Sequence, residues 1–191
     1  VVGITGRVGK TSTRDMVYSV VKQQYKTLKT EGNYNNNIGL PLTILRLKDE
    51  EVMILEMGMN HLNEMEELSR IACPDISAIT NVGTAHIGEL GSRENILKAK
   101  LEIVAGMSDG STLVINGDND MLSTVRFDNF KVVKVGVDCA AVFKAEKVIL
   151  MDDHSEFTIN YNGKVYQVVV PVPGNHFVLN ALVAIAIGIN L

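Results

Sequence analysis

The sequence predicts an α/β fold: a mostly parallel sheet of the P-loop type, flanked by helices, with a small antiparallel β-meander near the C-terminal end. Three observations support this prediction. Short runs rich in Val and Ile alternate with helical patterns over the first two-thirds of the chain, a glycine-rich turn joins the first run to the first helix, and β-rich runs take over after about residue 142. Strands that alternate with helices imply crossover connections, and these produce a parallel sheet covered on both faces.

The elements of the α/β part follow from the hydrophobic periodicity. We expect buried strands at residues 1–5, 52–56, 77–81, 112–116 and 132–137, where short apolar runs occur. Helical patterns lie between them, at 10–24, 62–72, 93–107 and near Met121, and a further helix is expected at 39–45. Pro41 fits that last helix, because proline is tolerated in a first helical turn.

The meander is expected at 147–151, 156–160 and 165–171. Asn162-Gly163 lies between two alternating runs, which is a strong hairpin signal. After Gly174 the pattern becomes helical again and stays so to residue 191.

Composition narrows the class of protein. The chain has 191 residues, of which 46% are hydrophobic and 21% charged, which is typical of a soluble globular domain. A net charge of −4 gives no general reason to expect nucleic acid or an anionic membrane as a partner. The first apolar segment is too short and too interrupted by glycine to be a signal peptide or a membrane span, so we expect a cytoplasmic protein without membrane insertion.

Two further features concern cysteines and chain ends. Cys73 and Cys139 lie far apart and form no metal-binding spacing, so we expect two reduced, buried thiols. The sequence starts directly on a strand-like run and stops on an apolar helical run without a cap. We therefore expect a piece of a longer protein.

The strongest chemical signal is a candidate phosphate loop at residues 5–11, Thr-Gly-Arg-Val-Gly-Lys-Thr, between a strand and a helix. Gly6 and Gly9 let the backbone turn tightly, and the helix N-terminus adds partial positive charge. Lys10 can reach terminal phosphates, and the Thr11 hydroxyl can bind Mg²⁺. The residues expected to bind the nucleotide are Gly6, Arg7, Val8, Gly9, Lys10, Thr11 and Ser12.

The loop departs from the strict pattern G-x-x-x-x-G-K-[ST], because Ile4 stands where the first glycine is required. Taken without its context, a Gly-x-x-Gly-Lys-Thr segment is also compatible with an ordinary turn and a solvated lysine. Its position between strand and helix favours the phosphate loop.

Beyond this loop the sequence resembles the Mur ligase family, over nearly the whole chain. The matching blocks are 30–43 (TEGNYNNNIGLPLT), 56–61 (EMGMNH), 81–86 (NVGTAH), 99–103 (AKLEI), 174–176 (GNH) and 180–181 (NA). The Asn-rich block at 30–43 is similar to that of the branch that adds D-alanyl-D-alanine to UDP-N-acetylmuramoyl-tripeptide.

The resemblance implies that residues 1–191 are the central ATP-binding domain of a three-domain ligase, without its N-terminal UDP-sugar domain and its C-terminal ligase domain. It implies ATP and Mg²⁺ as cofactors, UDP-N-acetylmuramoyl-tripeptide and D-alanyl-D-alanine as partners in the full-length enzyme, and a monomer. In this family ATP phosphorylates a peptide carboxylate, and the incoming amine attacks the resulting acyl phosphate to form an amide.

The resemblance also implies a metal site. Thr11, Glu56, His86 and Lys100 would hold Mg²⁺, with Lys100 carbamylated, and Lys10, His86 and Lys100 would be catalytic. Without the resemblance, Glu56 is compatible with a solvated strand end, His86 with a structural hydrogen bond, and Lys100 with a solvated helix face. Carbamylation needs a neutral amine, which desolvation favours. Lys98 is the alternative if the register is shifted.

Two further groups follow from the resemblance. The muramyl-peptide substrate would contact Thr30, Asn33, Asn35, Asn36, Asn60 and His61, although an Asn-rich stretch is also typical of an ordinary polar loop. The adenine would contact Asn180, supported by His176, although capping or packing roles are equally compatible with these two residues.

One departure from the family concerns the loop itself. The family usually has Ser or Thr and then Asn or Ser where this chain has Arg7 and Val8, so Val8 offers no polar side chain and Arg7 adds a charge beside the phosphates. Three alternatives stay open: a sister ligase or a folylpolyglutamate-synthase-like ligase, a non-catalytic nucleotide-binding module, and a structural scaffold.

Overall fold

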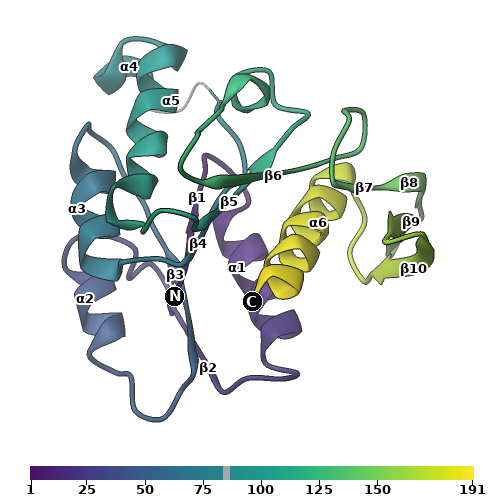
Figure 1. The fold of residues 1–191 in the computed structure, drawn as a ribbon, viewed down its shortest axis with the longest axis horizontal. Helices are drawn as coiled ribbons and strands as arrows, with labels where there is room; N and C mark the ends of the chain where they lie inside the picture. The colour runs from purple at the N-terminus through teal and green to yellow at the C-terminus, as the bar shows by residue number, and fades with distance from the viewer. Residues whose placement is uncertain (84–86) are drawn as a thin grey trace.

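The computed structural model describes residues 1–83 and 87–191, and in this part of the chain a seven-stranded sheet carries helices on both faces, with a three-stranded sheet beside it (Figure 1). The strand order in the larger sheet is β2-β3-β1-β4-β5-β6-β7, and each neighbouring pair is parallel. The smaller sheet is antiparallel, in the order β10-β9-β8. The fold class predicted from the sequence is confirmed.

The strands of the parallel sheet are β1 (Val2–Thr5), β2 (Thr27–Lys29), β3 (Val52–Glu56), β4 (Ile76–Ile79), β5 (Thr112–Asn116), β6 (Lys131–Gly136) and β7 (Phe143–Lys144). The helices are α1 (Lys10–Val21), α2 (Gly39–Ile44), α3 (Glu64–Ala72), α4 (Ile87–Leu90), α5 (Arg93–Leu101) and α6 (Asn175–Asn190). Two 3₁₀ turns, η1 (Glu102–Gly106) and η2 (Leu122–Thr124), and the meander strands β8 (Glu146–Leu150), β9 (Ser155–Tyr161) and β10 (Lys164–Val170) complete the described elements.

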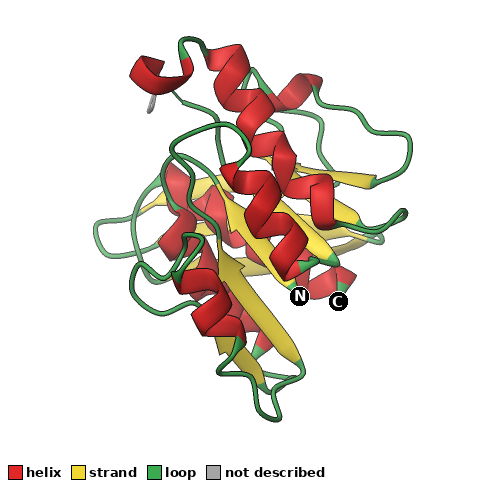
Figure 2. Ribbon diagram, turned by 90° about the vertical axis from the view of Figure 1, so that its left-hand side faces the viewer, coloured by secondary structure: helices red, strands yellow, loops and turns green. Residues whose placement is uncertain are grey.

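The strands are buried on both faces, which explains why they are continuous apolar runs. Successive residues of β3 point in opposite directions: Ile54 packs with α1 and α6, whereas Leu55 packs with α2, α3 and α5. Figure 1 shows these two groups of helices on opposite sides of the sheet, and Figure 2 shows the sheet from the side of α2, α3 and α5. Both clusters are formed mainly by buried side chains packed on the sheet, and this dense packing holds the residues at its edge in place.

The structure corrects several boundaries. The predicted strand 77–81 is β4, Ile76–Ile79, and the two residues after it leave the sheet. The predicted helix 93–107 is α5 followed by η1, and at the end of η1 the backbone of Gly106 packs so closely on Ser69 that a Cβ there would collide with the Ser69 carbonyl. Strands β2 and β7 were not predicted, because runs of three and two residues carry too little periodicity.

The two cysteines are both free, but Cys73 is exposed and Cys139 is only half-buried, so the expectation of two buried thiols is wrong. Cys73 terminates α3 with φ 46°, and this places its side chain at the surface. Among the described residues, no helix is long and apolar enough to cross a membrane.

The chain order of the strands positions the candidate site. From β1 the chain proceeds to β2 and β3 on one side, and then crosses to β4 on the other side. In open α/β sheets, ligands bind at the carboxyl ends of the strands where the order reverses in this way. The loop after β1 and the last residue of β3, Glu56, both lie at this edge.

Candidate active site

The loop from Gly6 to Gly9 connects β1 to α1. Gly9 has φ 83°, a conformation that glycine adopts without strain, and it begins α1 without any side-chain cap. The amides of a first helical turn have no partner within the helix, and here no acidic side chain lies in that turn. The start of α1 therefore offers backbone donors and positive potential to an anion.

Lys10 is the first residue of α1 and lies over the loop. Its Nζ donates a hydrogen bond of 3.1 Å to the carbonyl oxygen of Gly6. The side chain is half-buried and lines a pocket, so the ammonium group is available to a ligand that enters the loop.

Glu56, the last residue of β3, is the centre of a hydrogen-bonded group. It is 3% exposed, and its two carboxylate oxygens receive three donors from different parts of the chain. Thr11 Oγ1 lies 3.0 Å and Arg14 Nη1 3.4 Å from Oε2, while Asn35 Nδ2 lies 2.9 Å from Oε1. The Glu56 amide also donates to Thr30 Oγ1 at 3.0 Å. The carboxylate thus joins the phosphate loop helix to the Asn-rich loop.

Thr11 and Glu56 suit a hard cation. Both present oxygen atoms, and Mg²⁺ is typically bound by one or two carboxylates together with phosphate oxygens and water. No group of three or more His, Cys, Asp or Glu side chains that could hold a metal occurs among the described residues. His86 lies outside the described residues.

Lys100 is buried at the end of α5, with 3% of its surface exposed. Burial, and secondarily the positive charge of Lys10, lowers the pKa of Lys100 to about 8. A neutral amine is therefore far more accessible here than in a solvated lysine. Lys98, two residues earlier, is exposed. Burial therefore distinguishes Lys100 from Lys98, the two lysines that the sequence left as candidates for carbamylation.

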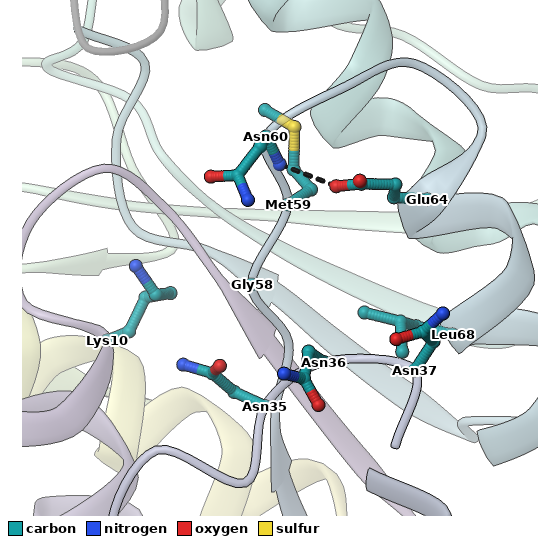
Figure 3. A pocket seen from close by; sticks show the side chains of 9 residues that line it. All are labelled: Lys10, Asn35, Asn36, Asn37, Gly58, Met59, Asn60, Glu64 and Leu68. Carbon is teal, nitrogen blue, oxygen red and sulfur yellow. Dashed lines mark hydrogen bonds between the residues drawn. The ribbon is translucent and has the colours of Figure 1, made fainter. Parts of the chain in front are cut away.

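A pocket of about 410 Å³ opens beside Lys10 (Figure 3). Its lining brings together residues of three segments that are distant in sequence, grouped around Gly58 as Figure 3 shows. The lining residues are Lys10, Asn35, Asn36, Asn37, Gly58, Met59, Asn60, Glu64 and Leu68. The phosphate-loop lysine and the Asn-rich loop therefore share one cavity.

The Asn-rich loop is fixed by close backbone contacts. The Gly58 amide donates to the Asn35 carbonyl at 2.8 Å, and a Cβ on Gly58 would lie 3.2 Å from Asn35 Cγ. Asn36 Oδ1 accepts from the amides of Ile38 and Gly39 at 3.1 and 2.8 Å, which begins α2. The loop is therefore ordered rather than a flexible polar linker.

The six residues expected to contact substrate occupy different positions. Asn35, Asn36 and Asn60 line the pocket. Thr30 is fully buried, does not line the pocket, and accepts a hydrogen bond from the Glu56 amide. Asn33 and His61 are exposed and are not among the lining residues.

The start of α6 lies beside the phosphate loop. Asn180 is 6% exposed, and a Cβ on Gly9 would lie 3.1 Å from its Oδ1. Its Nδ2 is buried without a hydrogen-bond partner among the described residues, which marks a donor that a ligand could satisfy. His176 is exposed and lies against Phe177, with ring centroids 4.1 Å apart.

A second, more apolar groove of about 490 Å³ lies between α1, β10 and α6. Ser12 lines its end nearest the phosphate loop, and Phe177 and Ala181 line its α6 side. His176 and Asn180 are the immediate sequence neighbours of these two α6 residues, but neither is among the lining residues.

Sequence reasoning missed Arg14 and Glu64. Arg14 is 5% exposed, pairs with Glu56 and Asp15, and donates to the Gly32 carbonyl at 3.4 Å. Glu64 accepts from the amides of Asn60 and His61 at 2.6 and 3.1 Å and lines the pocket. Both residues resemble ordinary charged helix positions in the sequence. The Arg14 pair with Glu56 gave no signal, because the two residues lie 42 positions apart in the sequence.

Comparison with known proteins identifies the family. The profile of the Mur ligase middle domain matches residues 4–188. A UDP-N-acetylmuramoyl-tripeptide–D-alanyl-D-alanine ligase of Bacillus subtilis (strain 168) is 41% identical over 189 residues, which covers 98% of this chain and 40% of the relative.

Solved structures agree with this match. A crystal structure of MurF from Acinetobacter baumannii superimposes with a TM-score of 0.91 at 30% identity, over 100% of this chain and 43% of that one. MurF ligase from Thermotoga maritima in complex with ADP has a TM-score of 0.90 at 27% identity, over 99% of this chain and 44% of that one.

The chain thus spans about 40% of the length of the Bacillus relative. The profile match covers almost all of the chain, and the matching structures share its entire fold. The chain therefore belongs to the Mur ligase family, in which it corresponds to the middle domain.

Proposed function

We propose that this chain is the ATP-binding domain of an enzyme that adds D-alanyl-D-alanine to UDP-N-acetylmuramoyl-tripeptide in peptidoglycan precursor synthesis, in the cytoplasm. The observation that carries this proposal is the shared pocket, whose lining includes Lys10 of the phosphate loop together with Asn35, Asn36 and Asn60. A nucleotide phosphate and an acceptor carboxylate can meet in such a cavity. The Bacillus subtilis relative is named as a UDP-N-acetylmuramoyl-tripeptide–D-alanyl-D-alanine ligase, which supports the choice of substrates.

The reaction consists of two balanced transfers. The γ-phosphoryl group of ATP passes to the terminal carboxylate of the tripeptide, which gives an acyl phosphate and ADP. The amine of D-alanyl-D-alanine then attacks the acyl carbon, an amide forms, and inorganic phosphate leaves. Phosphorylation is needed because a carboxylate oxygen is a poor leaving group.

The phosphate loop stabilises the transferring group. Lys10 and the backbone amides at the start of α1 would neutralise charge that develops on the phosphoryl oxygens. The residues proposed to hold the nucleotide are Gly6, Arg7, Val8, Gly9, Lys10, Thr11 and Ser12, with His176 and Asn180 at the adenine. The Asn180 Nδ2, which has no hydrogen-bond partner among the residues that the structure describes, supports its role as a donor to the base.

Thr11, Glu56, His86 and carbamylated Lys100 are the proposed Mg²⁺ ligands. When bound, the metal ion would neutralise phosphate charge and align the reacting oxygens. The chain's own contribution is to place Thr11 Oγ1 and Glu56 Oε2 3.0 Å apart, and to keep the Lys100 amine desolvated for reaction with CO₂.

The substrate side is proposed to lie on the Asn-rich loop. Asn35, Asn36 and Asn60 would contact the muramyl peptide directly, because they line the pocket. Thr30 would act through Glu56, and Asn33 and His61 would contact parts of the substrate outside the pocket. The remaining UDP-sugar and amino-acid sites are proposed to belong to domains on either side of this one.

Calorimetric titration with a non-hydrolysable ATP analogue and Mg²⁺ tests the nucleotide site. We expect binding by this chain, and a loss of at least tenfold in affinity with Lys10→Ala, about 1.4 kcal/mol or more. Lys98→Ala is the matched control, because Lys98 is exposed and the change of charge is the same. Equal affinity of the three proteins would contradict the proposed phosphate loop.

Ligation is expected only from the complete enzyme. An assay of phosphate release and amide formation with both substrates should show no turnover by this chain alone. Turnover by residues 1–191 would contradict the proposed division of the sites among domains. Turnover by the complete enzyme with a different amino acid in place of D-alanyl-D-alanine would contradict the proposed acceptor.

A further inference from the structure

The end of β4 contacts the first half of the phosphate loop. Asn81 Oδ1 accepts two hydrogen bonds from the loop backbone, from the Arg7 amide at 2.8 Å and from the Val8 amide at 3.2 Å. Thr80 Oγ1 donates to the Val8 carbonyl at 3.0 Å. These three bonds connect segments more than 70 residues apart in the sequence.

The contact is also steric. The Thr80 amide donates to the Thr5 carbonyl at 2.9 Å, which aligns Thr80 with the last residue of β1. A Cβ on Gly6 would collide with Thr80 Oγ1. The loop therefore turns directly against the Thr80 side chain, and only glycine at position 6 allows this approach.

The loop amides form two groups with different partners. Those of Arg7 and Val8 are satisfied within the protein by Asn81. Those at the start of α1 receive no capping side chain, because Gly9 has none to offer. The first group fixes the shape of the loop, and the second remains directed at a ligand.

We propose that Asn81 is a positioning residue for the phosphate loop: it holds the Gly6–Val8 backbone so that the amides at the start of α1 point at the nucleotide phosphates. The expected effect on nucleotide binding rests on the proposed nucleotide function. The contact between Asn81 and the amides of Arg7 and Val8, here called the Asn81 brace, does not depend on that function. It also accounts for the unusual Arg7-Val8 pair. The loop takes its shape from β4, so it needs no polar side chain at position 8.

An asparagine suits this position for a physical reason. Its carboxamide oxygen has two lone pairs, so it accepts from two successive amides, and it is neutral. An aspartate would accept the same bonds but would place a negative charge beside the phosphates. Alanine would leave two loop amides without their protein partner.

Hydrogen exchange of the Arg7 and Val8 amides in the nucleotide-free chain tests their hydrogen bonds to Asn81. We expect Asn81→Ala to accelerate exchange at both amides at least tenfold, and Asn81→Asp to retain their protection. Asn129→Ala is the control, because Asn129 is an exposed residue of a distant loop. If the Asn81→Ala variant folds, unchanged protection of the Arg7 and Val8 amides would overturn the proposal. If it does not fold, the test passes to Asn81→Asp, in which a loss of protection at these amides would overturn the proposal.

ADP affinity tests the consequence, with adenosine as the probe that lacks phosphates. Asn81→Ala and Asn81→Asp should each weaken ADP binding at least tenfold while adenosine binding stays within threefold of the parent chain. The double change Arg7→Ser, Val8→Asn should cost less affinity than Asn81→Ala; a larger cost would overturn the proposal.

The two proposals fail in different ways. If the parent chain binds no ADP and Lys10→Ala changes nothing, the nucleotide function fails, while amide exchange still decides the brace. If ADP binds through Lys10 but Asn81→Ala binds it equally well, the positioning role fails and the nucleotide function stands.

Discussion

Thr11 Oγ1 donates a hydrogen bond of 3.0 Å to Glu56 Oε2, which joins the first turn of α1 to the last residue of β3. The two residues are 45 positions apart in the sequence. They meet because parallel strands place their carboxyl ends at one edge of the sheet, and the phosphate loop after β1 leads α1 to the same edge.

Replacement of Glu56 by Gln tests the metal role of this pair. Gln retains an oxygen that can accept from Thr11, but the negative charge that would attract Mg²⁺ and that pairs with Arg14 is lost, so thermal unfolding first verifies that the variant is folded. We expect the gain in ADP affinity on adding Mg²⁺ to fall at least tenfold, about 1.4 kcal/mol. Calorimetry with Mg²⁺ and with EDTA measures this gain. Glu66→Gln, at an exposed residue of α3, should leave the gain unchanged.

Gly39 provides a test of the Asn-rich loop. An alanine in place of a helical glycine ordinarily stabilises a protein by roughly 0.5–1 kcal/mol. Here a Cβ would collide with the Tyr34 backbone, so we expect Gly39→Ala to destabilise the fold by about 1–3 kcal/mol instead.

Thermal unfolding gives the sign of this effect. The control is Gly88→Ala, also in a helix, where an added Cβ meets none of the described residues within 4 Å. The control should leave Tm the same or slightly higher. A raised Tm for Gly39→Ala would contradict the prediction, because it would mean that the backbone at Tyr34 moves to accommodate the added methyl group.

Lys100 gives a pH dependence of stability. Burial lowers the folded-state pKa from 10.5 to about 8, so the unfolded chain binds more protons between these values. The free energy of unfolding contributed by Lys100 therefore rises with pH from about 8 to about 10.5, and below pH 8 the burial cost is fully present. That cost is roughly 3 kcal/mol at 1.36 kcal/mol per unit.

Denaturant unfolding of the parent chain and of Lys100→Met at several pH values measures this contribution of Lys100 to the free energy of unfolding. The methionine variant should be the more stable of the two near pH 7, and the difference should shrink towards pH 10.5. Lys98→Met should show no such dependence, because Lys98 is exposed. A difference that is constant with pH would contradict the lowered pKa.

The same amine should react with CO₂. Incubation with ¹³C-bicarbonate is expected to give a carbamate resonance from the parent chain, because a pKa of about 8 leaves a substantial neutral fraction at neutral pH. The resonance should disappear in Lys100→Met and persist in Lys98→Met. Its persistence in the Lys100 variant would assign the carbamate to another amine.

The two cysteines should differ in reactivity. Burial, together with a hydrogen bond to Asp118, raises the pKa of the Cys139 thiol to about 11, whereas Cys73 is exposed. Because the thiolate is the nucleophile, iodoacetamide at pH 8 should alkylate Cys73 first. Mass spectrometry measures the rate of alkylation. The Cys73→Ser variant should be alkylated at least tenfold more slowly than the parent chain.

The fold class could be predicted from the sequence, and so could the position of a glycine-rich loop between β1 and α1. Strands β3 and β5 were predicted with their observed limits, because buried strands of a parallel sheet are apolar on both faces. The loop was predicted because its glycines and lysine are adjacent in the sequence. The Asn-rich loop, Glu56 and Lys100 were found only through the family resemblance, since one polar residue at a strand or helix end has no pattern of its own.

The tertiary structure alone decided which residues share the site. Arg14 and Asn81 have no local signature, yet one pairs with Glu56 and the other braces the phosphate loop. Lys98 and Lys100 are indistinguishable in the sequence, and burial separates them. The reason is physical: periodicity reports which face of an element is apolar, whereas hydrogen bonds and pKa values depend on contacts between elements that only the packing of the sheet brings together.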